Sequence, residues 1–201
     1  MRMRNPKDKN EVLENCDFYL TEDLFNNSNE IRMEIGMGKG DFILNMAIKY
    51  PEINFIGVEK YSSVASVAIK KIRDYKLENI RIFIGDVNTI PEYVFHKISL
   101  IYLNFSDPWP KARHDKRRLT HENYLKFYDN LFKKDAHIIM KTDNDDLFAF
   151  SEQSFLDYGY HILFKSYDLH KEDMDNVETE YEKKFSDKGF LIKYIDVEKK
   201  R

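Results

Sequence analysis

Short apolar runs alternate along the chain with segments whose apolar residues recur every three or four positions. The runs are typical of buried strands, and the recurring segments are typical of helices with one buried face. The predicted strands are residues 30–35, 54–58, 79–84, 98–105, 136–140, 160–165 and 189–197. The predicted helices are residues 42–49, 61–75, 120–132 and 147–158, and residues 180–185 stay ambiguous.

This order of elements predicts a three-layer α/β fold with a mostly parallel, seven-stranded sheet. No long helix separates the last two strands, so we expect them to form an antiparallel terminal hairpin. Residues 1–29 show no sustained period apart from a short helix near residues 10–16. We therefore expect a loosely ordered, partly flexible N-terminal arm over residues 1–29 and one domain over residues 30–201.

The composition predicts a cytoplasmic protein. No apolar run approaches the ~20 residues that span a bilayer, and the charged N-terminus lacks the apolar stretch of a signal peptide. Cys16 is the single cysteine and cannot form an internal disulfide, which fits a reducing compartment. The net charge of −3 gives no global sign of nucleic-acid binding, so such binding would require a local basic patch.

A glycine-rich loop follows the first predicted strand. Gly36, Gly38 and Gly40 stand at alternate positions, which is typical of a backbone that turns sharply and lies close to a ligand. The third glycine comes one residue early for the G-x-G-x-x-G fingerprint, which counts against the alternative of an NAD-dependent dehydrogenase. We expect Asp41 to cap the helix that follows.

Acidic residues end the next two predicted strands. Glu59 follows residues 54–58, where a carboxylate is placed to accept hydrogen bonds from ribose hydroxyls. Asp86 follows residues 79–84, where it could accept a hydrogen bond from the amine of an adenine. Because these strand ends converge on one crevice, we expect a ligand to bind there.

The stretch over residues 98–118 joins a buried strand, a stiff loop and a basic arm. Pro108 and Pro110 restrict the residues before them, so we expect Asp107 and Trp109 to be extended. Residues 111–118 carry five lysines and arginines against one aspartate. A carboxylate, an aromatic ring and a cationic arm at a strand end favour a flat substrate attached to a polyanion, although a turn beside a solvated basic face is the alternative.

Several motifs together carry a resemblance to a known family. They are residues 34–40 with Glu59 and residues 85–86, residues 103–119, residues 141–143, and residues 179–185. This set resembles the bacterial tRNA (guanine-N7)-methyltransferases, which are class I S-adenosylmethionine-dependent enzymes that modify the guanine at position 46 of the tRNA variable loop. The family's basic arm usually continues with an aromatic residue after its proline, where this chain has Lys7 and Asp8.

The resemblance implies a Rossmann-like class I methyltransferase fold, S-adenosylmethionine as cofactor and tRNA as RNA partner. It assigns catalysis to Asp107 and cofactor binding to Glu34, Gly36, Gly38, Glu59, Asp86 and Asp107. It assigns substrate binding to Lys111, Asp143, Thr179, Glu180, Tyr181 and Glu182. It assigns RNA contacts to Arg113, His114, Lys116, Arg117 and Arg118. The histidines show no metal-ligand spacing, so we expect no metal. We also expect no membrane association, no obligate protein partner, and a monomer or weak homodimer.

The chemistry of this reaction needs no general base, because guanine N7 carries a free lone pair. Alignment of the reactants supplies about 7–11 kcal/mol, and a carboxylate, Asp107 or Asp143, would stabilise the cation that forms on the purine. Either acid could also select guanine over adenine, and Trp109 either stacks on the base or packs against its own loop. Amino-group methylation of adenine or cytosine and a catalytically dead RNA-binding module are the alternative functions.

Overall fold

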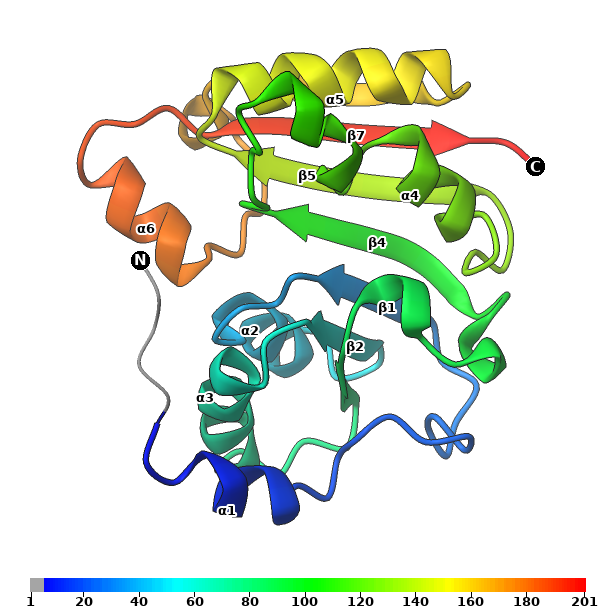
Figure 1. The fold of residues 1–201 in the computed structure, drawn as a ribbon, viewed down its shortest axis with the longest axis vertical. Coiled ribbons are helices and arrows are strands. Elements are labelled where there is room, and N and C mark those ends of the chain that lie inside the picture. The colour runs from blue at the N-terminus through cyan, green and yellow to red at the C-terminus, as the bar shows by residue number, and fades with distance from the viewer. Residues whose placement is uncertain (1–5) are drawn as a thin grey trace. The chain divides into compact units, whose positions relative to one another are not determined.

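The chain divides into two compact units, Met1–Val94 and Phe95–Arg201, and the computed structural model describes residues 6–201 (Figure 1). The first unit holds a parallel three-stranded array in the order β3-β2-β1. Its strands are β1 (Ile31–Ile35), β2 (Asn54–Glu59) and β3 (Ile80–Ile84). Its helices are α1 (Lys9–Glu14), α2 (Asp41–Lys49), α3 (Ser62–Arg73), and the 3-10 turns η1 (Val87–Thr89) and η2 (Glu92–Val94).

The second unit holds four strands in the order β4-β5-β7-β6. They are β4 (Ile98–Asn104), β5 (Ala136–Thr142), β6 (His161–Ser166) and β7 (Lys193–Lys199). Its helices are α4 (Glu122–Tyr128), α5 (Asp145–Asp157), α6 (Glu180–Ser186), and the 3-10 helices η3 (Ala112–Arg117) and η4 (Leu169–Lys171). Strands β4 and β5 are parallel, whereas β7 runs antiparallel to both β5 and β6. The seven strands and the antiparallel end are therefore confirmed.

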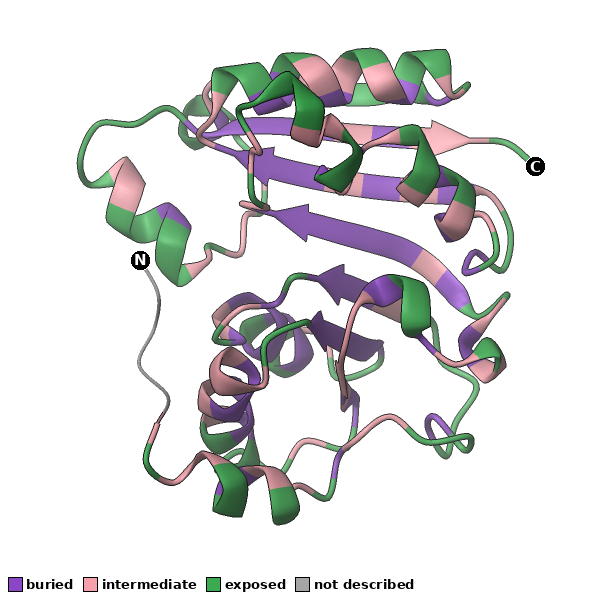
Figure 2. Ribbon diagram, viewed as in Figure 1, coloured by how far each residue is buried: buried purple, intermediate pink, exposed green. Residues whose placement is uncertain are grey.

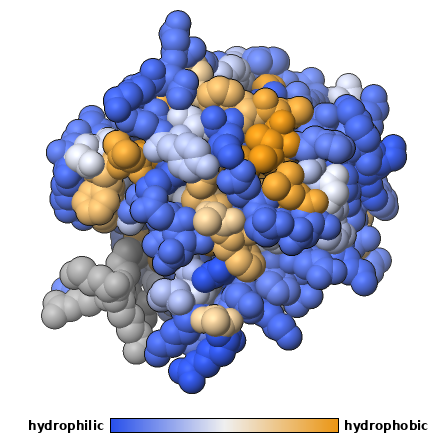
Figure 3. Space-filling view, turned by 90° about the horizontal axis from the view of Figure 1, so that it is seen from above, coloured by the Kyte–Doolittle hydropathy of each residue, from blue (hydrophilic) through white to orange (hydrophobic). Residues whose placement is uncertain are grey.

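The burial of the strands explains why they could be predicted from the sequence. Figure 2 shows β2, β4 and β5 as buried along most of their length. In β2 every residue is buried, as expected of a strand covered on both faces. The edge strand β6 is different, because Leu163 is 55% exposed and Phe164 is 39% exposed. Figure 3 shows apolar side chains gathered within a mostly hydrophilic face of the molecule.

The N-terminal segment packs onto the first unit over the residues that the structure describes. Helix α1 lies against α3 (Figure 1), and its Val12 is 5% exposed. The backbone of Ile82 in β3 accepts a hydrogen bond from Leu20 N (2.9 Å) and donates one to Phe18 O (3.0 Å). These contacts differ from the loosely ordered arm that we expected, although residues 1–5 lie outside the described part and the domain boundary near residue 29 stays a prediction.

Three local expectations need correction, and one ambiguous segment is resolved. Asp41 is the first residue of α2, and its cap is Gly40, whose φ of +77° only glycine adopts readily. Trp109 has φ +43° and so is left-handed rather than extended. The last strand begins at Lys193 rather than at residue 189, because Gly189 turns the chain with φ +82° and the two residues that follow it are exposed. The ambiguous residues near 180 form α6.

Within residues 6–201, no helix is long and apolar enough to cross a membrane.

Candidate functional site

The glycine loop of the first unit forms an open backbone cradle at the end of β1. Gly36 N and Met37 N both donate to Val58 O, at 2.8 Å and 3.0 Å, so the loop folds back over the end of β2. Gly36 has φ +81° and Gly38 has φ +58°, and a Cβ built on either would meet no atom within 4 Å. The loop therefore leaves room for a ligand to approach the backbone closely.

Glu59 connects this loop to the end of β3. Its Oε2 accepts from Gly38 N at 3.1 Å and its Oε1 accepts from Tyr61 N at 2.8 Å. Its backbone carbonyl accepts from Gly85 N at 3.0 Å. Glu59 is buried, at 7% exposure. Glu59 thus brings together Gly38 and the Gly85–Asp86 turn.

Asp86 is held as an anion at the end of β3. Its Oδ2 accepts from Lys60 Nζ at 3.0 Å, and its Oδ1 accepts from both the backbone N and the side-chain Nδ2 of Asn88 at 3.1 Å. Burial by itself raises the pKa of Asp86, but the hydrogen bonds from Lys60 and Asn88 outweigh it and lower the pKa below its usual value. Glu34, the remaining cofactor candidate of this unit, is buried in β1 beside Gly57 of β2.

In the second unit, the loop after β4 presents Asp107 to solvent. Within residues 6–201 its carboxylate has no hydrogen bond or ion pair. Trp109 is half-buried, with the Arg117 guanidinium 4.8 Å from its ring centre and the His114 ring packed edge-on at 5.8 Å. One side of the indole is therefore already covered by the basic arm.

Arg118 supports this loop from inside. It is 9% exposed, its Nε donates to Pro108 O at 3.0 Å, and its second guanidinium nitrogen donates to Trp109 O at 3.2 Å. Its guanidinium also lies 4.3 Å from the ring centre of Phe150. These contacts hold the Arg118 side chain within the protein, and its expected contact with RNA stays a prediction. The exposed residues of the arm are Lys111, Arg113, Lys116 and Arg117, and His114 is half-buried.

Asp143 lies just beyond β5 and is in contact with α6. Tyr181 OH donates to Asp143 Oδ2 at 3.3 Å. The Tyr181 ring lies 4.9 Å from the ring of Phe105 and stacks on Phe185 at 4.1 Å, both measured between ring centres. Burial, then the charge of Asp143 and the hydrogen bond to it, raise the pKa of Tyr181 to about 12.

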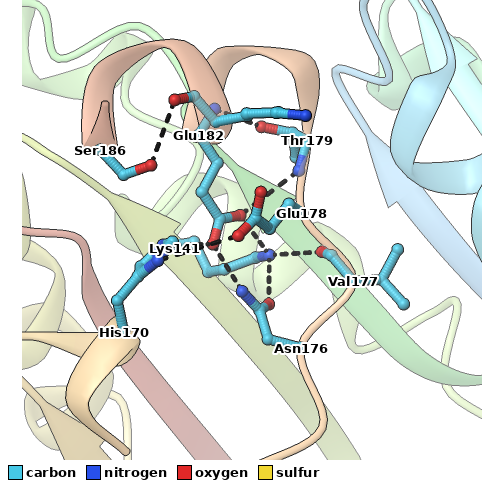
Figure 4. A network of polar contacts seen from close by, with 9 residues as sticks. Lys141, His170, Asn176, Val177, Glu178, Thr179, Glu182 and Ser186 are labelled. Carbon is cyan, nitrogen blue, oxygen red and sulfur yellow. Dashed lines mark hydrogen bonds and ion pairs between the residues drawn. The ribbon is translucent and has the colours of Figure 1, made fainter. Parts of the chain in front are cut away.

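Glu182 is the centre of a buried polar network (Figure 4). Its Oε2 lies 2.7 Å from Lys141 Nζ, and the two side chains are 0% and 3% exposed. Asn176 donates to Glu182 Oε1 at 2.6 Å, and His170 Nε2 lies 3.1 Å from the same oxygen. Thr179 completes a capping box with Glu182 at the start of α6. The Glu182 carboxylate thus faces Lys141, and its expected contact with substrate stays a prediction.

Sequence reasoning missed the residues that hold Glu182. Lys141 ends an otherwise apolar strand, and a lysine in such a place needs a buried anionic partner, so it carried a signal. Asn176 and His170 lie in a polar loop and carried none. Thr179 is the N-cap of α6, while Glu180 and Tyr181 are exposed on it. Among residues 6–201, no three histidine, cysteine or carboxylate side chains are grouped so that they could hold a metal ion.

Comparison with known proteins supports the resemblance over most of the chain. Residues 28–194 match the family described as a putative methyltransferase. A tRNA (guanine-N(7)-)-methyltransferase of Bacillus subtilis is 44% identical over 178 residues, covering 87% of this chain and 83% of that protein. One of the same name from Streptococcus mutans is 41% identical over 208 residues, covering 98% of this chain and 99% of that protein.

Solved methyltransferase structures share the fold. One described as a SAM dependent methyltransferase from Aquifex aeolicus matches with a TM-score of 0.56 at 14% identity, covering 96% of this chain and 99% of that one. The predicted class I methyltransferase fold is confirmed by such matches.

Proposed function

We propose, since the chain belongs to the family of tRNA (guanine-N7-)-methyltransferases, that it transfers a methyl group from S-adenosylmethionine to N7 of a guanine in tRNA. We further propose position 46 of the variable loop as the target. The observation that carries the proposal is the glycine cradle tied to Glu59, because an open backbone loop beside a carboxylate at a strand end suits a nucleoside cofactor.

The residues of the first unit fit S-adenosylmethionine. The backbone of Gly36 and Gly38 is open to a ligand, and the Glu59 carboxylate lies next to it at the end of β2, where an acid is placed to accept from ribose hydroxyls. We propose that Glu34 holds the methionine end and that Asp86 accepts from the adenine amine. The cofactor, when bound, supplies an electrophilic methyl group on a sulfonium.

The acidic residues after β4 and β5 would contact the guanine. Asn104 and Lys141 are register partners in the parallel strands β4 and β5, so Asp107 and Asp143 lie at the same end of those strands. Guanine N7 needs no proton removed, so the task of these residues is to orient the base and offset the positive charge that forms on it. We propose Asp107 as the catalytic carboxylate, and we propose that it also contacts the cofactor. Lys111 and Thr179 are among the proposed substrate contacts.

The exposed cations of the second unit would bind the phosphates of the RNA. Arg113, Lys116 and Arg117 lie on η3 and are exposed to solvent, and Arg117 also covers the Trp109 ring. We propose that they contact phosphates and so set the register of the tRNA without reading its sequence. His114, half-buried against Trp109, adds a fourth contact. A local patch of this kind reconciles RNA binding with the net charge of −3.

The test is methylation of unmodified tRNA with methyl-labelled cofactor, followed by mapping of the labelled nucleotide. We expect a single N7-methylguanosine at position 46. A parallel tRNA with 7-deazaguanosine at that position removes the nucleophilic nitrogen, and we expect no label on it. Label on the deaza substrate would favour amino-group methylation, and absence of label on all tRNA would favour an RNA-binding module without activity.

A further inference from the structure

The loop after β5 and helix α6 fix one of the two candidate acids while the other stays unrestrained. We infer that Asp143, held by Tyr181, is the residue that selects guanine, and that Asp107 does not read the base. This inference deepens the proposed function and rests on it.

Helix α6 is anchored from beneath. Glu182 is 0% exposed and bonds Lys141 of β5 at 2.7 Å, while Lys141 Nζ also donates to Asn176 Oδ1 at 3.0 Å and to Val177 O at 2.9 Å. Because Lys141 lies two residues before Asp143, the same strand end carries both the anchor of α6 and the acid that α6 contacts. Figure 4 shows Lys141 beside Glu182 of α6. The position of α6 relative to Asp143 is therefore set by a buried ion pair.

This anchor aims Tyr181 at Asp143. The Tyr181 ring contacts the rings of Phe105 and Phe185, and its hydroxyl donates to Asp143 Oδ2, so three contacts orient the side chain. The backbone of Asp143 is held as well, because Lys193 Nζ donates to its carbonyl at 3.0 Å. One hydrogen bond restrains Asp143 Oδ2. Oδ1 and the second lone pair of Oδ2 therefore remain as hydrogen-bond acceptors of fixed direction.

Asp107 has none of these restraints within residues 6–201. It is exposed, and no side chain hydrogen-bonds to it. The support that Arg118 gives to the loop reaches the carbonyls of Pro108 and Trp109, not the Asp107 carboxylate.

The two tasks of the site differ in what they demand of a carboxylate. Selection of guanine requires two acceptors in line with N1–H and the N2 amine, and such recognition depends on groups that are oriented before the base arrives. The electrostatic interaction that offsets a delocalised charge weakens slowly with distance and depends less on the direction of the carboxylate. The restrained acid therefore suits selection, and the unrestrained one suits charge compensation.

The test compares two tRNAs that differ only at the target nucleotide, guanosine or inosine, because inosine lacks the N2 amine and keeps N7. We expect the wild-type enzyme to prefer guanosine in kcat/KM by about tenfold or more. Tyr181→Phe keeps the ring contacts and removes only the hydroxyl, so the fold is preserved. We expect it to lower kcat/KM on guanosine by about tenfold, with little change on inosine. Tyr75→Phe, an exposed tyrosine of the first unit, is the matched control and should change neither.

Two further variants separate the acids. In Asp143→Asn the guanosine preference should be lost, and adding Tyr181→Phe should cost nothing more, because the tyrosine acts through that carboxylate. In Asp107→Asn both substrates should slow in the same proportion. A guanosine preference that is undiminished in Tyr181→Phe, or that is lost in Asp107→Asn and kept in Asp143→Asn, would overturn the inference. Absence of N7-methylguanosine with the wild-type enzyme would refute the proposed function and this inference together.

Discussion

Lys141 of β5 and Glu182 of α6 form an ion pair of 2.7 Å in which the two side chains are 3% and 0% exposed. The pair joins residues 41 positions apart and is completed by Asn176, His170 and the Val177 carbonyl. A charge that deep in the protein is tolerated only when it is paired and hydrogen-bonded. The pair is therefore the structural basis on which α6 reaches the residues proposed to contact guanine.

Removing one partner of this pair should destabilise the protein strongly. Lys141→Met leaves the Glu182 carboxylate buried without its cation, and we expect a loss of about 3–5 kcal/mol in the free energy of unfolding. Urea denaturation followed by circular dichroism measures it. The control is Lys165→Met, which breaks the half-exposed pair with Glu152, where we expect about 0–1 kcal/mol. Equal losses in the two variants would contradict the role assigned to the buried pair.

Glu59→Gln should weaken cofactor binding. The substitution replaces a charged acceptor that bonds Gly38 N and Tyr61 N with an amide that has one acceptor oxygen. We expect the Kd for S-adenosylmethionine to rise about tenfold or more, since hydrogen bonds to charged groups contribute about 1.5–3 kcal/mol. Titration calorimetry gives the value. Glu78→Gln, an exposed glutamate of the same unit, should leave the Kd unchanged.

Asp107→Asn should reduce turnover while the cofactor still binds. The amide keeps the size of the side chain and removes the charge that offsets the cation on the purine, so we expect kcat to fall by about 100-fold. Single-turnover methylation assays at saturating tRNA measure this. Asp146→Asn, exposed on α5, is the matched control. Unchanged kcat would remove Asp107 from the catalytic role.

Two arginines of the basic stretch should behave differently. Arg113→Gln should weaken tRNA binding and lower the slope of log K against log salt by about 0.7–0.9, the value for one phosphate contact. Arg118→Lys loses the paired donation to Pro108 and Trp109. We expect it to lower kcat by about 10- to 100-fold through displacement of the loop, with the salt slope unchanged. Binding measured at several salt concentrations separates the two, and a changed slope in Arg118→Lys would assign that residue to RNA after all.

The titration of Tyr181 should report its bond to Asp143. Its pKa is raised to about 12, above the usual value of about 10, so the folded state favours the neutral phenol. The stability that this contributes is complete below about pH 10 and is lost as pH rises through about 12. Near pH 11, between these values, the tyrosinate absorbance of the wild-type protein should equal that of Tyr181→Phe. In Asp143→Asn the pKa of Tyr181 should fall part of the way toward its usual value, because the charge of Asp143 is removed while burial, the largest cause of the shift, remains. An unchanged titration in that variant would show that burial alone sets the pKa.

Local patterns were enough to place most elements. Strands β2 and β4 were recognisable because burial on both faces makes a strand apolar along its length, a property of the sequence itself. Errors gathered where the backbone takes a left-handed turn. Trp109 at φ +43° and the late start of β7 after Gly189 depend on contacts outside the local window.

The sequence by itself determined the α/β order of the chain, the glycine loop, and the acids Glu59, Asp86, Asp107 and Asp143 at strand ends, because parallel strands deliver their carboxyl ends to one edge. Only the tertiary structure decided what each polar group is doing. Glu182 faces Lys141 from 41 residues away, and Tyr181 reaches Asp143 from 38 residues away. Such partners are set by how the loop before α6 folds back on β5. Composition and residue spacing do not specify the path of this loop, because many different sequences place polar residues at the ends of strands in the same way.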